Sequence, residues 1–303
     1  MLLKSRSESE ELMAMRYLNN RMELTQDEKF RYSILEKGYE GEVRFDRLAE
    51  GLHEEIYIIN DLLLKVNNSY FQIDTLFILQ GVVHLLDVKN YQGDYYLEKE
   101  KLYAVSTGRE YKNPLDQLKR CSTLFTQLLQ ILKLNFLFEA SAIFINPEFT
   151  LYQAPMDQPI IFPSQVNRFL TDINKTPSKL NDGHKKLAHT LISLHQTKNP
   201  YTELPEYSYD KVQKGIYCKA CGSFQVSINN NYHFVCGDCG VHESIEQGIL
   251  RNVNEFKLLF PDRRITTQNI YDWCMVDLHK RTFCRALKKN FTTFGKTSDT
   301  YFK

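Results

Sequence analysis

Two closely spaced pairs of cysteines constrain the fold of this chain more than any other feature of its sequence. Each pair has the form C-x-x-C-G, and fourteen residues separate the first pair from the second. Four thiolates at this spacing can close a tetrahedral shell around zinc, which makes the ion structural. The pattern therefore predicts a zinc-binding module whose ligands are Cys218, Cys221, Cys236 and Cys239.

The sequence around these cysteines favours a zinc ribbon over residues 210–245. The glycine after each pair permits the tight turn that directs backbone amides at the thiolates. Two β-prone runs at 224–227 and 232–235 flank an Asn-rich turn at 229–231, so we expect a hairpin between the pairs. A redox role is the alternative, since a single C-x-x-C motif also occurs in thioredoxin-like enzymes, but the doubled motif favours the metal.

The composition indicates a globular chain without a membrane span. Hydrophobic residues make up 43% and charged residues 25% of the 303 positions, which excludes a disordered protein. No stretch approaches the roughly 18 apolar residues of a transmembrane helix, and Glu8, Glu10 and Glu11 do not fit a secretory signal. Seven cysteines, an odd number with two metal-type pairs, indicate a reducing compartment. We therefore expect a cytoplasmic protein with no membrane partner.

Changes in residue pattern along the chain predict four segments. Residues 1–36 are rich in charge and lack Pro and Gly, which predicts an N-terminal helical segment. Residues 37–200 begin with an amphipathic helix over about 40–50, followed by short β-prone runs that include a hairpin around 98–101, a long helix, another strand and two more helices. This order predicts an α/β or α+β domain. The zinc ribbon at 210–245 and a helical segment at 246–303 complete the chain.

A predicted hairpin with its turn at 80–81 brings charged residues together. In this register Asp74 faces Asp87 and Gln72 faces Lys89, all on one face of the sheet. Two opposed carboxylates repel each other, and a bridging Mg²⁺ would compensate. Lys89 would then lie beside the metal-bound water or the scissile phosphate. A solvated strand face is the ordinary alternative for an Asp-x-Lys triplet, but the apolar surroundings predict partly buried charges that need partners.

Four motifs follow one another in a characteristic order. They are Gly38-x-x-Gly41-Glu42 on a helix, Ile73-Asp74-Thr75-Leu76-Phe77-Ile78 and Leu86-Asp87-Val88-Lys89-Asn90-Tyr91-x-Gly93 on strands, and Asn113-Pro114-x-x-Gln117 on the next helix. Together they resemble the NERD (nuclease-related) domain, which is similar to the PD-(D/E)xK nucleases, over residues 35–170. The resemblance implies a restriction-endonuclease-like core with a central mixed sheet flanked by helices. It also implies hydrolysis of phosphodiesters by an activated water, with Mg²⁺ or Mn²⁺ as cofactor.

The resemblance assigns roles to five residues, which we call the acid site: Glu42, Asp74, Asp87, Lys89 and Gln117. Asp74 and Asp87 match the metal-binding acids, and Lys89 matches the lysine of the core motif. This chain has Asp87 where most members carry Glu. Glu42 matches a helix-borne acid, although a Glu in the first turns of a helix is also favoured by the helix dipole alone. Gln117 matches the glutamine of the following helix, where a structural role is equally ordinary.

The C-terminal segment is basic. Residues 246–303 carry eleven Lys and Arg against six Asp and Glu, in a chain of net charge +1. Three short helices are predicted here, and the last carries Arg281, Arg285, Lys288 and Lys289. A helix-turn-helix could place this last helix in the major groove or against phosphates. The alternative is a helical cap on the ribbon whose charges are solvated.

These features predict a metal-dependent nuclease that acts on DNA, with RNA as the alternative substrate, and whose ribbon and basic segment bind the nucleic acid. A complete set of acidic and lysine residues favours catalysis. The alternative is a protein on a nuclease fold that binds nucleic acid without cutting it, or that docks a partner. Nucleases of this superfamily are often dimers, so a homodimer is a further expectation.

Overall fold

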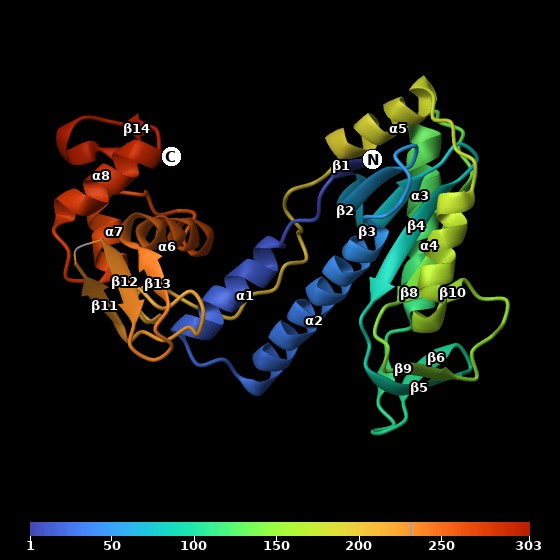
Figure 1. Cartoon of the computed structure of the whole chain (residues 1–303), viewed down its shortest axis with the longest axis horizontal. Helices are drawn as coiled ribbons and strands as arrows, with labels where there is room; N and C mark the ends of the chain where they lie inside the picture. Colours follow the sequence, from blue (N-terminus) through green and yellow to red (C-terminus); the bar gives the residue numbers. More distant parts are fainter. Residues whose placement is uncertain (231) are drawn as a thin grey trace. The chain divides into compact units, whose positions relative to one another are not determined.

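The computed structural model describes residues 1–230 and 232–303, in two compact units (Figure 1). The first unit contains residues 1–8 and 33–202, and the second contains residues 9–32 and 203–303. The predicted segment 1–36 is thus divided between the units, and the predicted ribbon and basic segment share the second one. Position 231 of the predicted ribbon turn lies outside the described residues.

A six-stranded mixed sheet forms the centre of the first unit. Neighbours β2–β3 and β3–β4 are antiparallel, whereas β1–β2, β4–β8 and β8–β10 are parallel. This arrangement confirms the predicted α/β class with a central mixed sheet. In spatial order the strands are β1 (Leu2–Lys4), β2 (Tyr57–Val66), β3 (Ser69–Ile78), β4 (Val83–Lys89), β8 (Phe138–Phe144) and β10 (Ile160–Ile161).

Helices cover both faces of this sheet (Figure 1). On one face, α3 (Pro114–Ile131) and α5 (Asp182–Ser193) pack in a buried cluster with the inner strands. On the other face, α2 (Gln26–Ala49) and α4 (Val166–Lys175) form a second cluster around Phe45. The inner strands are therefore buried on both sides, which explains their nearly continuous apolar sequences.

Helix α2 begins much earlier than predicted. Apolar spacing predicted a helix over residues 40–50, whereas α2 begins at Gln26. Its first turn is closed by a capping box, in which Glu28 N donates to Thr25 Oγ1 at 3.3 Å and Thr25 N donates to Glu28 Oε2 at 2.7 Å. The N-terminal half is mostly polar, so its apolar pattern is too weak to reveal the helix, although the Thr-x-x-Glu signal is present.

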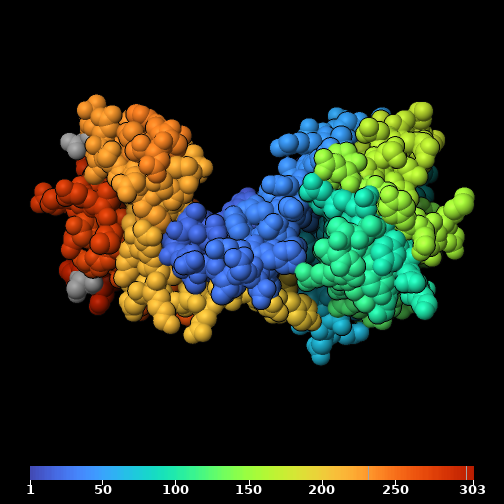
Figure 2. All heavy atoms as spheres, turned by 90° about the horizontal axis from the view of Figure 1, so that it is seen from below, coloured from blue at the N-terminus to red at the C-terminus, as the bar shows by residue number. Residues whose placement is uncertain are grey.

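A small four-stranded sheet lies at the surface of the first unit (teal to green in Figure 2). Its strands, in spatial order, are β7 (Glu110–Tyr111), β6 (Lys101–Ala104), β5 (Gly93–Glu98) and β9 (Phe149–Tyr152). The predicted hairpin around residues 98–101 is confirmed as β5–β6. Aromatic side chains, among them Tyr95 and Phe149, pack this sheet against the end of β8.

The second unit combines a three-stranded antiparallel sheet with helices. The sheet consists of β11 (Val226–Asn229), β12 (His233–Cys236) and β13 (His242–Ser244), and a short hairpin of β14 (Thr293–Phe294) and β15 (Tyr301–Phe302) lies near the C-terminus. The helices are α1 (Glu10–Arg21), α6 (Ile245–Leu259), α7 (Thr267–Cys274) and α8 (Lys280–Asn290). None of the helices in residues 1–230 and 232–303 has the length and apolar character of a membrane span.

Helix α1 belongs to this second unit because of one buried arginine. Arg21 donates to both carboxylate oxygens of Glu255 at 2.6 and 2.9 Å and to Asn252 Oδ1 at 3.0 Å. Its guanidinium also lies 4.0 Å from the ring centre of Trp273. Removing one partner of such a buried pair is strongly destabilising, so α1 is an integral part of the unit that contains the cysteines.

Candidate functional site

The two aspartates of the acid site lie where β3 and β4 separate. These strands pair as far as Thr75 and Leu86, in the register predicted from the sequence. Asp74 comes next on β3, and its Oδ2 accepts a hydrogen bond from the backbone N–H of Val88 at 2.8 Å. A side chain thus takes the place of a strand carbonyl, which places the Asp74 carboxylate beside the backbone of the Asp87 segment.

Gln72 does not follow the predicted alternation. Ile73 and Leu76 lie in the same buried cluster, although strict alternation would put them on opposite faces of the sheet. Asp61, opposite Asp74 in the β2–β3 register, has a φ of 55°, and a left-handed residue interrupts the regular pleat. The prediction that Gln72 shares the face of Lys89 was therefore wrong, and its amide donates to Asp61 instead.

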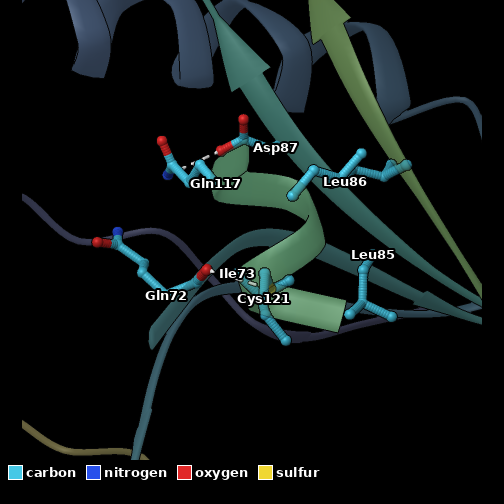
Figure 3. Close-up of a pocket in the computed structure, with 8 residues that line it drawn as sticks. Gln72, Ile73, Leu85, Leu86, Asp87, Gln117 and Cys121 are labelled. Atoms are coloured by element: carbon cyan, nitrogen blue, oxygen red, sulfur yellow. Dashed lines mark hydrogen bonds between the residues drawn. The ribbon is translucent and has the colours of Figure 1, made fainter. Parts of the chain in front are cut away.

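Asp87, Lys89 and Gln117 form one hydrogen-bonded group. Asp87 Oδ1 accepts hydrogen bonds from Lys89 Nζ at 2.8 Å and from Gln117 Nε2 at 3.2 Å, and Figure 3 shows the latter contact. Lys89 Nζ also donates to Gln117 Oε1 at 3.3 Å. Gln117 reaches the strand from the first turns of α3, whose predicted start is confirmed by the Asn113 cap and Pro114.

The second oxygen of Asp87 has no protein partner. Asp87 is 8% exposed, and its Oδ2 is the one buried carboxylate oxygen without a hydrogen bond in the described part of the chain. A buried polar atom without a partner is costly, and a divalent cation with its water shell is a suitable partner for a carboxylate. Asp74 and Asp87 are thus the residues that fit Mg²⁺ or Mn²⁺.

Burial and neighbouring charges change the pKa values of Asp74 and Lys89. Burial raises the pKa of Asp74 to about 6, and the charge of Asp87 acts in the same direction. Burial alone would lower the pKa of Lys89, but the carboxylates of Asp87 and Asp74 outweigh this effect and raise it. Lys89 therefore stays protonated at neutral pH and can donate hydrogen bonds, but it cannot act as a general base.

Glu42 is held by Arg6, a residue that the sequence analysis did not identify. Arg6 Nη1 donates to Glu42 Oε2 at 2.7 Å, and its Nε and Nη2 donate to the two oxygens of Asp46 at 2.9 and 3.0 Å. Nη2 also donates to the carbonyl oxygen of Asp74 at 2.8 Å and to Thr75 Oγ1 at 3.0 Å. No motif contains Arg6, because it lies two residues after a three-residue strand and far from its partners in the sequence.

Glu42 does not form a compact three-acid cluster with Asp74 and Asp87. Burial raises the pKa of Glu42 to about 8, Asp74 adds to this effect, and Arg6 opposes it. Among the residues that the structure describes, the cysteines are the one group of three or more metal-type ligands within 4.8 Å of one another. Glu42, Asp74 and Asp87 therefore do not form a closed cage of three carboxylates.

A glycine brings α2 close to the acid site. A Cβ atom added to Gly41 would lie 2.5 Å from the Cβ of Asn90, which follows the strand that carries Lys89. Asn90 Nδ2 in turn donates to the carbonyl oxygen of Lys37 on α2 at 2.7 Å. The glycine before Glu42 in the family motif thus has a steric reason, since a larger residue would force the helix away from the strand.

The four predicted cysteines come together in the second unit. Their sulfur atoms all lie within 4.8 Å of one another, which is compatible with a structural zinc ion. Gly222 and Gly240 have φ angles of 74° and 71°, as the predicted tight turns require. The backbone N–H of Ala220 points at Cys218 Sγ, 3.4 Å away.

The predicted basic residues lie on α8. The side chains of Arg281, Arg285, Lys288 and Lys289 are all exposed. Lys289 pairs with Glu246 of α6 at 2.9 Å, whereas Phe283 and Leu287 on the opposite side of α8 are fully buried. The apolar face of α8 therefore packs against the unit, and the opposite face presents positive charge. That this charged face binds nucleic acid stays a prediction.

Acids and a lysine at the ends of neighbouring strands, joined by an amide from the next helix, define a nuclease-like α/β domain. The comparison with known families agrees with this class. Residues 37–146 match the family model NERD, the nuclease-related domain, and this part of the chain is such a domain. The matched range contains the whole acid site and leaves out Arg6 and the four cysteines. No curated protein and no solved structure matches the chain.

Proposed function

We propose that the first unit is a nuclease that hydrolyses phosphodiester bonds of DNA with Mg²⁺ or Mn²⁺. The observation that carries this proposal is the buried, unpartnered Oδ2 of Asp87 beside Asp74. Within the same hydrogen-bonded group, the ammonium group of Lys89 lies 2.8 Å from the other carboxylate oxygen of Asp87. An acid pair with an unpartnered carboxylate oxygen, next to a fixed positive charge, suits a reaction in which negative charge develops on phosphate oxygens.

Each residue of the group has a distinct task in this reaction. Asp74 and Asp87 would hold the ion, which supplies an activated water and charge stabilisation when bound. Lys89, kept protonated by its acidic neighbours, donates a hydrogen bond to the attacking water or to the phosphate. Gln117 bonds both Asp87 and Lys89 and so keeps the two side chains in one geometry.

For the second unit we propose a structural zinc and a phosphate-binding surface on α8. Four thiolates satisfy zinc without an open position, so the ion would stabilise the unit rather than catalyse a reaction. Free thiolate ligands suit a reducing compartment, and we place the protein in the cytoplasm. The exposed Arg281, Arg285 and Lys288 fall at helical spacings of four and three residues, so they share one face and can contact successive phosphates.

The first experiment is a cleavage assay on supercoiled, linear and branched DNA with Mg²⁺ or Mn²⁺. We expect metal-dependent cutting that Asp87→Asn abolishes and that Lys89→Ala reduces by roughly 10²- to 10³-fold, the usual cost of one charge-stabilising donor. Asp116→Asn and Lys119→Ala are matched controls, because they make similar changes at exposed positions on α3 and should leave the rate unchanged.

Two results would contradict the proposal. Cutting that survives Asp87→Asn would place the chemistry elsewhere. Absence of cutting on all of these DNAs and on RNA, combined with salt-sensitive binding, would favour the second candidate, a protein that binds nucleic acid without cleaving it. The observation in favour of that candidate is that Glu42 is already paired with Arg6 and does not join the other acids.

A further inference from the structure

Arg6 is the most completely bonded side chain near the acid site. It is 3% exposed, and its three nitrogens make five hydrogen bonds. The segment that carries it is fixed as well, since β1 pairs with β2 and Lys4 Nζ donates to the carbonyl oxygens of Asn60 and Asp61 at 2.9 and 2.7 Å. The guanidinium is therefore a permanent part of the site.

The contacts of Arg6 divide the acids into two sets. Glu42 and Asp46, on adjacent turns of α2, share the fork of the guanidinium. Asp74 and Asp87 lie on the strands, and Asp87 retains the one buried carboxylate oxygen without a partner in the described residues. A guanidinium keeps its charge at any relevant pH and binds carboxylates through two parallel hydrogen bonds. Arg6 thus neutralises Glu42 and Asp46, the two acids on α2, as a bound metal cation would otherwise do.

We propose that Arg6 takes the position of a second metal ion, so that the acid site binds a single divalent ion between Asp74 and Asp87. Glu42 is then a positioning residue that acts through Arg6 and is not a metal ligand. Arg6 also bonds the carbonyl oxygen of Asp74 and the hydroxyl of Thr75, so it fixes the backbone from which the Asp74 carboxylate extends. The inference rests on the proposed function, because it assumes that Asp74 and Asp87 hold a metal.

The test is a count of Mn²⁺ ions bound per chain, by paramagnetic resonance of free Mn²⁺, in the full chain loaded with zinc. We expect one Mn²⁺ per wild-type chain, and none after Asp87→Asn. Glu42→Gln should keep a count of one with an affinity change of less than about tenfold, since it removes a neighbouring charge but no ligand. Because this variant is nearly isosteric, it remains informative even if changes at Arg6 prevent folding.

Arg6→Gln is the complementary variant, and Arg47→Gln, the same change at an exposed position on α2, is its control. If the variant is folded by circular dichroism, Arg6→Gln should raise the count to two, because Glu42 and Asp46 lose their internal cation. Arg47→Gln should keep the count at one. Two ions in the wild type, loss of the ion in Glu42→Gln, or a count of one in folded Arg6→Gln would overturn the inference and leave the proposed nuclease intact. If the wild-type chain shows no Mn²⁺ binding that depends on Asp87, both this inference and the proposed nuclease function are overturned.

Discussion

At the scale of single residues, the acid site contains more carboxylate oxygens than the protein provides hydrogen-bond donors for. Asp87 uses one oxygen for Lys89 and Gln117 and leaves the other without a protein partner. One carboxylate oxygen of Asp74 accepts a hydrogen bond from the backbone N–H of Val88. Burial and the charge of Asp87 raise the pKa of Asp74, so a nearby positive charge favours its ionised form.

This predicts opposite effects of pH on stability and on metal affinity. Without divalent metal, the pKa values of Asp74 and Glu42 are raised to about 6 and about 8, so the folded chain binds more protons than the unfolded chain from about pH 4 upwards. The free energy of unfolding should therefore fall between about pH 4 and 8. Affinity for Mn²⁺ should rise over the same range, because the ion displaces protons.

Urea unfolding and Mn²⁺ titrations at pH 5.5 and pH 8 would measure both effects. Asp74→Asn should flatten the part of the stability change that centres near pH 6. A wild-type chain whose stability is the same at both pH values, or a Mn²⁺ affinity that falls as pH rises, would show that these carboxyls are ionised in the folded state at acidic pH.

At the scale of helices and strands, the sequence pattern predicted elements whose signals are local. The β3–β4 register followed from alternation, and the capped start of α3 followed from an Asn-Pro cap. The break in alternation at Asp74 was missed because it depends on the left-handed Asp61 of a neighbouring strand. Arg6 was missed for a similar reason, since its role depends on contacts distant in sequence.

Two glycines on α2 give a matched test of how this helix approaches the strands. Gly41→Ala places a Cβ against Asn90 and should destabilise the protein by about 1–3 kcal/mol, as overpacking usually does. Gly38→Ala, one turn earlier, meets nothing within 4 Å and should stabilise it by about 0.5–1 kcal/mol through helix propensity. Urea unfolding of both variants measures the difference, and equal effects would show that α2 does not lie close to Asn90 in solution.

At the scale of the whole molecule, neither compact unit is a continuous stretch of the chain. Residues 9–32 belong to the second unit, whereas the residues on both sides of them belong to the first. Composition and periodicity could not predict this, because α1 is an ordinary amphipathic helix whose partner is specified by Arg21 and Glu255, 234 residues apart. The cysteine site, in contrast, was predictable because metal ligands have a fixed spacing.

Removal of zinc should unfold the second unit and leave the first one folded. Trp273 is the single tryptophan of the chain and lies fully buried in the second unit against Arg21. A zinc chelator should therefore shift its fluorescence to longer wavelengths, while β-sheet circular dichroism from the first unit largely persists. Unchanged tryptophan emission in a chain shown by metal analysis to have lost zinc would mean that the cysteines do not stabilise this unit.

The distance in sequence between Arg21 and its partner has a consequence for synthesis on the ribosome. At roughly 5–20 residues per second, Glu255 is made about 12–47 seconds after Arg21. The first unit is complete once residue 202 has emerged, but α1 must wait, with Leu12, Met15 and Leu18 still without the core that buries them. The nascent chain thus carries α1 with its apolar face exposed and the guanidinium of Arg21 without its partner. We expect chaperones to bind at this helix until the cysteine-containing part has been synthesised.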